Sequence, residues 1–360
     1  MGVVEVLKEG LDSKPAANRP AGIEIRQALR PAAGMTVKPP SYEGSLEVHP
    51  RQLDGEVRNV IELDSVGSSA NRIEDALIDL FDAGEYPLPV ATTTIDPGDG
   101  QPPIEISTLA APHRTFDGWL RLSENEDGVK FEDTEQGQDL TLAHMKRLDA
   151  ILETSAHDLL FGTWDSHRTG AHGQLRVARS LTTTLIGLDP EVQQPIAARR
   201  DPLNLGEASD LPKGAKKLSE QGLSSIPPQR TKETVSISSA LFQGYLSFPS
   251  LRRLGFERYD ATEVRIMLAL LGLYGLLLRN DQGWDIRSGA AFVPEGPMEF
   301  RLARPDGSQE ALDLDPAVVR EELDAAVARV GIKDREIRLK AGKTLNELVA
   351  NSISAAKNQG

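Results

Sequence analysis

The chain contains no cysteine among its 360 residues. This absence excludes disulfide bonds, thiolate zinc sites and a cysteine nucleophile. It also fits a reducing compartment, so we expect the protein to reside in the cytoplasm. The composition is otherwise ordinary for a globular protein, with 39% hydrophobic and 26% charged residues.

Membrane-directing segments are also missing from the sequence. The first residues, MGVVEVLKEGLDSKPAANRP, mix acidic with apolar side chains and have no basic region before a hydrophobic run, so no signal peptide is expected. The longest apolar run, IMLALLGLYGLLL at 266–278, has 13 residues, which is short for a bilayer-spanning helix. We expect a buried helix and no membrane partner.

The usual enzyme motifs do not occur either. There is no phosphate-binding loop, no G-x-G-x-x-G after a predicted strand and no G-x-S-x-G elbow. A metal site could be built from His157, Asp165 and His167, with His144 upstream. Along a strand, however, His157 would lie far from the other two, so we expect neither metal nor cofactor.

Charge is distributed unevenly. The net charge is −14, and the segment 62–139 holds 18 acidic residues against 4 basic ones. In contrast, the stretch FGTWDSHRTGAHGQLRVARSL at 161–181 has three arginines and no acid after Asp165. A local basic groove can hold a polyanion on an acidic protein, because screening limits the reach of each charge to about 10 Å.

The order of predicted elements suggests an α+β fold. VRNVIELDSV at 57–66 is typical of a strand, and Ile73, Leu77, Leu80 and Phe81 form one apolar face of a following helix. Further strands are expected near 87–95, 158–166, 234–248, 284–294 and 298–307, a hairpin within 113–133, and helices at 142–155, 262–279, 316–330 and 343–357. The stretch 175–188 fits a helix in its first half and a strand in its second.

The β, α, β, β, α, β order favours a ferredoxin-like core, the architecture of the RNA-recognition motif. We expect an irregular, Pro-rich and Gly-rich N-terminal arm at 1–55, a core at 56–304 and a C-terminal helical segment at 305–360. The core would carry an acidic insertion at about 84–139. A Pro-rich basic span would follow at about 189–230, with Lys213, Lys216 and Lys217.

The arginine-rich stretch at 161–181 has two interpretations. It could be a solvated strand end whose arginines pair with the acidic segment, or a phosphate track in which Trp164, His167 or His172 stacks on exposed bases. The start of the first helix is equally ambiguous. Asn71 with Glu74 fits a capping box, and Ser68 or Ser69 could cap instead, but these residues and Arg72 could also bind an anion.

The blocks LDSVGSSANRIEDAL, LLFGTWDSHR, RVARSLTTTLIGLD, KLSEQGLSSIPP and WDIRSGAAFVP occur in this order. Together they resemble the signature blocks of the CRISPR-associated RAMP proteins of subtype I-G, formerly I-U. The resemblance covers about residues 55–300. WDIRSGAAF has alanine where a cysteine is expected, and the N-terminal arm matches only loosely.

The resemblance implies the non-catalytic backbone subunit of a Cascade complex, which polymerises head to tail along CRISPR RNA and presents the guide to target DNA. It implies an RNA-recognition-motif-like palm with inserted finger and thumb elements, the thumb falling at about 189–230. Other partners would be the large subunit and the RNA-processing subunit. The RNA-binding residues expected on this basis are Ser68, Ser69, Asn71, Arg72, Trp164, Ser166, His167, Arg168, Arg176, Arg179 and Arg287. The alternative is a metal-dependent RAMP ribonuclease that uses Asp165 and nearby histidines.

Overall fold

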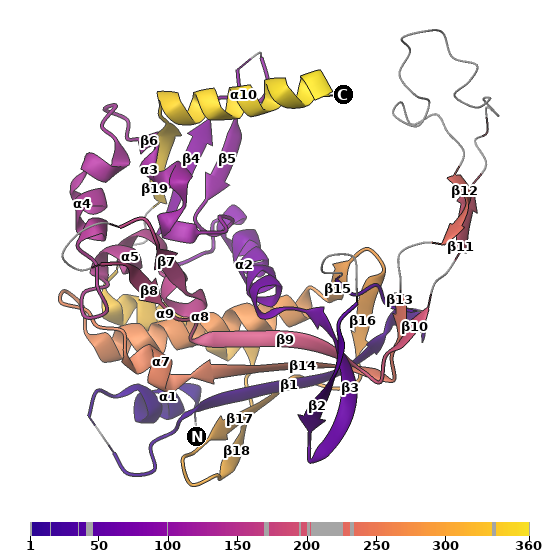
Figure 1. The fold of residues 1–360 in the computed structure, drawn as a ribbon. Coiled ribbons are helices and arrows are strands. Elements are labelled where there is room, and N and C mark those ends of the chain that lie inside the picture. The colour runs from indigo at the N-terminus through magenta and orange to yellow at the C-terminus, as the bar shows by residue number, and fades with distance from the viewer. Residues whose placement is uncertain are drawn as a thin grey trace.

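The structure is a computed structural model that describes most of the chain. The described residues are 2–14, 16–34, 36–40, 46–98, 100–168, 173–193, 196–199, 202, 226–230, 234–332 and 336–359. The fold is built around a nine-stranded sheet and a smaller four-stranded sheet (Figure 1). It therefore has the mixed helix and strand content that the sequence predicts.

The nine-stranded sheet has the order β15-β16-β1-β14-β9-β3-β2, and β17 pairs with both β1 and β18. All of its described pairings are antiparallel. Its strands are β1 (Gly22–Pro31), β2 (Val48–Leu53), β3 (Glu56–Asp64), β9 (Leu181–Leu188), β14 (Ser239–Ser247), β15 (Trp284–Arg287), β16 (Ala290–Pro294), β17 (Glu299–Ala303) and β18 (Gln309–Leu312).

The prediction of an irregular N-terminal arm is wrong. α1 (Val3–Leu11) packs against the helical layer, and β1 lies in the middle of the sheet between β14 and the strands β16 and β17. In β1 the buried Ile23 and Ile25 alternate with the exposed Glu24 and Arg26, as expected for a strand with one covered face. The prolines and glycines near this segment lie at the ends of the strand, so they do not prevent the strand from forming.

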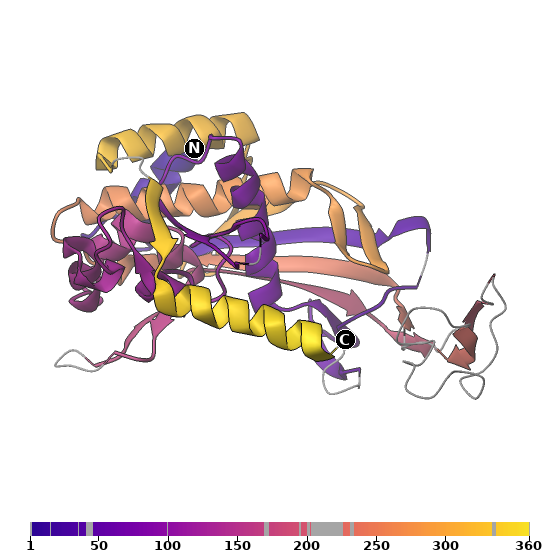
Figure 2. The same ribbon diagram turned by 90° about the horizontal axis from the view of Figure 1, so that it is seen from above.

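Helices cover one face of the sheet. Figure 2 shows α9 (Pro316–Val330), α8 (Ala261–Asp281) and the sheet as successive layers. α2 (Val66–Asp82) packs on α8 where a β-carbon on Gly275 would lie 2.8 Å from Cγ2 of Ile73. Glycine therefore lets these two helices approach closely.

The predicted apolar helix is confirmed as α8. By length and composition it could cross a membrane, but most of it is enclosed by the rest of the protein, as expected for a core helix. The opposite face of the sheet stays accessible. Thr182 and Thr184 of β9, and Gln243 and Tyr245 of β14, point to that face and are only partly buried.

The acidic segment forms most of the smaller sheet, whose order is β5-β4-β19-β6. β19 (Glu336–Ala341) comes from the C-terminal segment and pairs in parallel with β4 (Val90–Ile95). The other two strands are β5 (Ile104–Ser107) and β6 (Ser123–Glu124). The two predicted C-terminal helices are confirmed as α9 and α10 (Lys343–Gln359), but β19 between them was not predicted.

Three local predictions in the middle of the chain are wrong. The segment 113–133 contains short helices and an isolated bridge between Glu124 and Lys130 in place of a hairpin. The helix predicted at 142–155 begins only at Asp149, because the chain first makes a tight turn at 144–147. Only 163–165 of the strand predicted at 158–166 is a strand, because 158–161 form a short helix that ends at Gly162, with φ 85°. The elements here are η2 (Arg114–Phe116), α3 (Gly118–Arg121), η3 (Phe131–Asp133), α4 (Glu135–Thr141), α5 (Asp149–Ser155), α6 (Asp158–Phe161) and β7 (Thr163–Asp165).

The remaining elements are short. β8 (Leu175–Val177) pairs with β7, and the ambiguous stretch 175–188 therefore forms two strands, β8 and β9. β10 (Glu191–Gln193) pairs with β13 (Thr234–Ser236), and β11 (Ile196–Arg199) pairs with β12 (Ile226–Arg230). Most of the candidate thumb between β11 and β12, including its lysines, lies outside the described residues. Two further short helices are η1 (Ala32–Gly34) and α7 (Phe248–Arg252).

Candidate nucleic-acid interface

The start of α2 and the β7–β8 hairpin lie together, although they are about a hundred residues apart in the sequence. A β-carbon on Gly67, in the first turn of α2, would be 4.0 Å from Nη2 of Arg179, which follows β8. Ser65 is the N-cap, and its Oγ accepts a hydrogen bond from the backbone N–H of Ser68 at 3.3 Å. The cap thus lies three residues before Ser68, the first serine predicted to cap the helix, and the partly buried first turn of the helix faces an arginine.

A cleft separates these elements, and we call it the arginine cleft. It has a volume of about 540 Å³ and is lined by Val66, Pro112, His113, Arg114, Phe161, Gly162, Thr163, Trp164, Ser166, Arg176, Val177, Ala178, Arg179 and Thr182. These residues include three arginines and a histidine but no aspartate or glutamate. On a protein of net charge −14, such a lining is a marked local excess of positive charge.

Two of the three arginines have no ion-pair partner among the described residues. Arg176 is exposed, and its guanidinium lies 5.9 Å from the ring centroid of Trp164. Arg179 is also exposed. Although much of its surface is accessible, the protein around part of its side chain lowers the pKa of Arg179, and the charge of Arg114 lowers it further while that of Glu74 opposes the shift. An anion bound at this position would raise the pKa of Arg179 again, because a nearby negative charge stabilises the protonated guanidinium.

The third arginine anchors the cleft floor. Burial alone would lower the pKa of Arg114, but its hydrogen bonds to Glu74 raise the pKa above the ordinary value. Its Nε and Nη2 donate to the two carboxylate oxygens of Glu74 at 2.6 and 2.7 Å. Nη1 donates to the backbone oxygen of Gly162 at 3.1 Å. Arg114 therefore joins α2 to the turn that leads into β7.

Trp164 is unusually exposed for its residue type, with 54% of its surface accessible. Its Nε1 donates to Oε1 of Gln174 at 3.3 Å, which ties it to the β8 side of the hairpin. Figure 2 shows this hairpin projecting from the body. An exposed indole with an arginine over its ring can also stack on a base, because bases and guanidinium groups both have flat faces.

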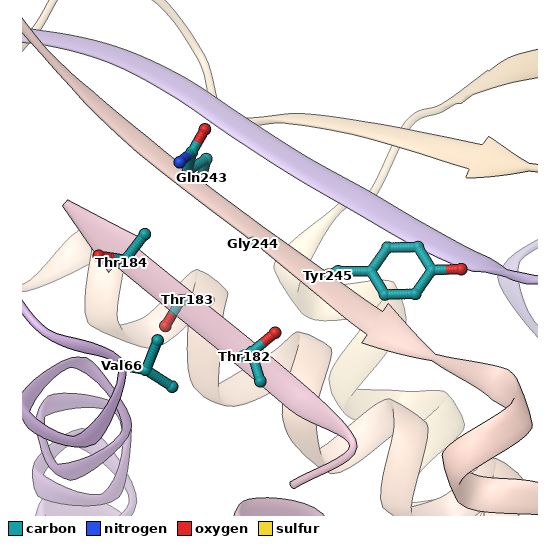
Figure 3. Close-up of a pocket in the computed structure, with 7 residues that line it drawn as sticks. All are labelled: Val66, Thr182, Thr183, Thr184, Gln243, Gly244 and Tyr245. Atoms are coloured by element: carbon teal, nitrogen blue, oxygen red, sulfur yellow. The ribbon is translucent and has the colours of Figure 1, made fainter. Parts of the chain in front are cut away.

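A second depression adjoins the arginine cleft on the open face of the sheet, and we call it the sheet pocket. It has a volume of about 270 Å³ and is lined by Val66, Thr182, Thr183, Thr184, Gln243, Gly244 and Tyr245 (Figure 3). Val66 and Thr182 line both depressions. They therefore form one path from the β7–β8 hairpin, past the start of α2, onto β9 and β14.

Arg168, one of the predicted RNA contacts, is buried and bonded within the protein. Only 6% of its side chain is exposed. It donates to Oδ2 of Asp165 at 3.1 Å, to the backbone oxygen of Leu140 at 2.7 Å and to that of Ala143. Its donors are used within the protein, so we remove Arg168 from the candidate interface.

The polar residues of α2 also differ from expectation. Ser69 is buried, and its Oγ forms a 2.6 Å hydrogen bond with Oγ1 of Thr183. Glu74, the predicted capping-box partner of Asn71, is instead engaged by Arg114, and Asn71 is an exposed residue within the helix. Neither Ser69 nor Asn71 lines the arginine cleft.

Two other predicted arginines gather around one buried carboxylate. Nε of Arg72 donates to Oδ2 of Asp64 at 3.0 Å, and Nη2 of Arg287 lies 3.5 Å from Oδ1 of the same side chain. The backbone oxygen of Asp64 accepts a hydrogen bond from Oγ1 of Thr184, which lines the sheet pocket. Arg72 and Arg287 thus lie near Thr184, at the end of the sheet pocket away from the arginine cleft. The carboxylate of Asp64 partly balances their charge.

The remaining predicted residues flank the hairpin. Ser166 lines the arginine cleft, and its backbone oxygen accepts a hydrogen bond from Gln174 at 3.1 Å. His167 is exposed beside Ser166, with 3.4 Å between Nδ1 and Oγ. His172 lies outside the described residues. Of the eleven predicted residues, Trp164, Ser166, Arg176 and Arg179 line one cleft.

The positions of Asp165 and His157 do not favour the alternative of a metal site. Asp165 is hydrogen-bonded to Arg168, whereas His157 is fully buried beside Ser155 and Asp158. Within the described ranges, no group of three or more His, Asp or Glu side chains could hold a metal ion.

Sequence reasoning missed Arg114, His113, Gln243 and Tyr245. Arg114 and His113 lie in the segment 62–139, where the excess of acidic residues gave no indication of a basic cleft. Gln243 and Tyr245 are partly buried and lie between the buried Phe242 and Leu246 of β14, which is a usable signal for a two-faced strand. Which face stays open could not be predicted, because it depends on where α2 and α8 pack.

Comparison with known proteins gives one family. Residues 23–192 match the family described as CRISPR-associated protein GSU0053, and this region contains β1, α2, the arginine cleft and β9. No curated protein sequence matches the chain significantly. The crystal structure of Thermofilum pendens Csc2 aligns with a TM-score of 0.33 and 10% identity, over 99% of this chain and 85% of that one, which is too distant to support an argument.

Proposed function

We propose that this chain, whose residues 23–192 match the CRISPR-associated GSU0053 family, is a non-catalytic backbone subunit of a subtype I-G Cascade complex and binds CRISPR RNA in the arginine cleft. The observation that supports this most strongly is the pair Arg176 and Arg179. Both are exposed and without a carboxylate partner among the described residues, in a cleft with no acidic lining. Guanidinium groups in this state match phosphate oxygens in two-point contacts.

The cleft is suited to binding without regard to base sequence. Arginines contact phosphates, and Trp164 can stack on any base, so neither reads base edges. The guide must leave its base edges free, because pairing with target DNA reads the sequence in RNA-guided complexes. A cleft that grips backbone and base faces meets this requirement.

The strand order supports a palm of the RNA-recognition-motif type. In chain order the elements β1, α2, β9, β14, α8 and β16 follow the β-α-β-β-α-β pattern, and β16, β1, β14 and β9 are neighbours in the sheet. We assign the first palm strand to β1, although the sequence predicted it at 57–66. The hairpin β2–β3 is then an insertion before the first helix.

Head-to-tail assembly along the RNA is part of the proposal. Such a polymer needs two different complementary surfaces on each copy. The acidic segment at 62–139, with 18 acidic residues against 4 basic ones, would supply one of these surfaces. We place the complex in the cytoplasm, with the large subunit and the RNA-processing subunit as further partners.

Purification of the full chain from cells that express a CRISPR array tests the proposal. We expect small RNA to co-purify, to be identified by sequencing as array-derived, and to remain uncut after addition of magnesium or manganese. RNA affinity should fall linearly with the logarithm of salt concentration and be similar for unrelated guides. A clean protein spectrum without salt-dependent RNA binding would contradict the proposal, and metal-dependent cleavage would favour the ribonuclease.

A further inference from the structure

The sheet pocket differs chemically from the arginine cleft that it adjoins. None of its lining residues is charged, and its polar groups are threonine hydroxyls, one amide and one phenol. Thr182 is paired with Tyr245, and Thr184 with Gln243, so the four side chains form two cross-strand rows on the same face (Figure 3). A neutral, hydrogen-bonding surface of this kind does not suit a phosphate, which favours cations.

Three of these polar groups are available to a ligand. The hydroxyl of Thr183 is bound to Ser69, and that of Thr184 donates to the backbone of Asp64. In the part of the chain that the structure describes, the side chains of Thr182, Gln243 and Tyr245 make no hydrogen bond. Partial burial raises the pKa of Tyr245, which keeps its phenol protonated as a donor.

The position of the pocket indicates which part of a polynucleotide reaches it. Thr182 lines both the pocket and the cleft that contains Arg179, so a chain whose phosphate contacts Arg179 passes next to Thr182. The group adjacent to a phosphate is a sugar. In RNA this sugar carries a 2′-hydroxyl, which donates and accepts hydrogen bonds and is the group that distinguishes RNA from DNA.

We propose that the sheet pocket is a ribose subsite, in which Thr182, Gln243 and Tyr245 hydrogen-bond to the 2′-hydroxyls of neighbouring riboses and select RNA over DNA. The inference rests on the proposed RNA-binding function and adds the residues that discriminate the sugar. Hydroxyl and amide side chains are matched to this role, because each can donate to or accept from a hydroxyl. The arginine cleft would bind either nucleic acid, since their phosphates are alike.

The test compares the full-length protein with the double variant Thr182→Val/Tyr245→Phe, which keeps the shape of both side chains and removes both hydroxyls. Affinity is measured for single-stranded RNA and for single-stranded DNA of the same base sequence. We expect the variant to bind RNA about tenfold more weakly, as for the loss of two neutral hydrogen bonds, while its affinity for DNA stays within about twofold.

Two controls separate the sugar from the phosphate. Arg179→Ala should weaken RNA and DNA binding by the same factor, and Ser354→Ala, an exposed hydroxyl on α10, should change neither. Thermal unfolding of each variant checks that it is folded. Equal loss for RNA and DNA in the double variant, or no loss for either, would overturn the ribose subsite while leaving RNA binding intact. Absence of salt-dependent RNA binding by the unaltered protein would overturn both proposals.

Discussion

Glu74 and Arg114 form a two-point ion pair beneath the arginine cleft, with N–O distances of 2.6 and 2.7 Å. The two side chains are 4% and 8% exposed. The pair links α2 to η2, and Arg114 also holds the backbone of Gly162. Two segments of the cleft wall that are distant in sequence are thus positioned by one buried contact.

Glu74→Ala should destabilise the protein strongly, because it leaves the Arg114 charge buried without a partner. Loss of one member of a buried ion pair costs about 3–5 kcal/mol. The measurement is chemical or thermal unfolding followed by circular dichroism. As a control, Glu347→Ala removes one partner of an exposed pair with Lys343 on α10 and should leave the unfolding transition unchanged. A small effect of Glu74→Ala would show that the pair does not hold the cleft wall.

Arg176→Ala with Arg179→Ala should weaken RNA binding without destabilising the fold, since neither side chain has an ion-pair partner within the described residues. We expect a loss of about tenfold or more in affinity for each lost charged contact. The salt dependence should flatten by about 0.7 in the logarithmic slope for each phosphate contact removed. Fluorescence anisotropy with several unrelated guide sequences measures both quantities. A loss confined to one guide would argue against phosphate contacts.

Trp164→Ala should reduce RNA affinity by about 1–3 kcal/mol, which is the usual contribution of one base stacked on an aromatic side chain. Unlike the arginine variants, it should leave the salt slope unchanged, because stacking releases no counterions. Trp164→Phe should restore part of the affinity. Quenching of the exposed indole fluorescence by RNA gives a direct readout of the contact. Unaltered fluorescence at saturating RNA would place Trp164 outside the interface.

Arg168→Ala should behave in the opposite way to the arginine variants of the cleft. Its removal leaves two backbone oxygens and Asp165 without their charged donor, so we expect a loss of stability of about 2–3 kcal/mol. RNA affinity of the folded variant should match that of the unaltered protein. Unfolding and binding measured on the same preparation distinguish the two arginine classes. Weaker RNA binding with normal stability would return Arg168 to the interface.

Much of the local structure follows from side-chain periodicity. The strand β3 and the helices α2, α8, α9 and α10 were predicted because their apolar residues recur at one spacing over many residues. β1 was missed although it alternates cleanly, because the flanking prolines and glycines were weighed above the alternation. The short elements between 113 and 161 were mispredicted because fewer than eight residues carry too little periodic signal.

Part of the candidate site could likewise be predicted from the sequence, and part could not. Residue types and charge pattern predicted Trp164, Arg176 and Arg179, and all three line the arginine cleft. They also predicted Arg168, since sequence alone does not distinguish an exposed arginine from one that is bonded within the protein. Gln243 and Tyr245 had no charge or motif that could mark them, and their position beside Thr182 depends on the pairing of β9 with β14.

The sequence by itself determined the absence of thiol chemistry, the long helices, the concentration of acidic residues in one segment and the blocks that indicate a CRISPR-associated family. Only the tertiary structure decided which arginines remain available to an anion and which face of the sheet stays open. The physical reason is that the state of a charged side chain depends on its neighbours in space. Arg168 meets the carbonyl groups of residues 140 and 143, whereas Arg179 meets the start of a helix.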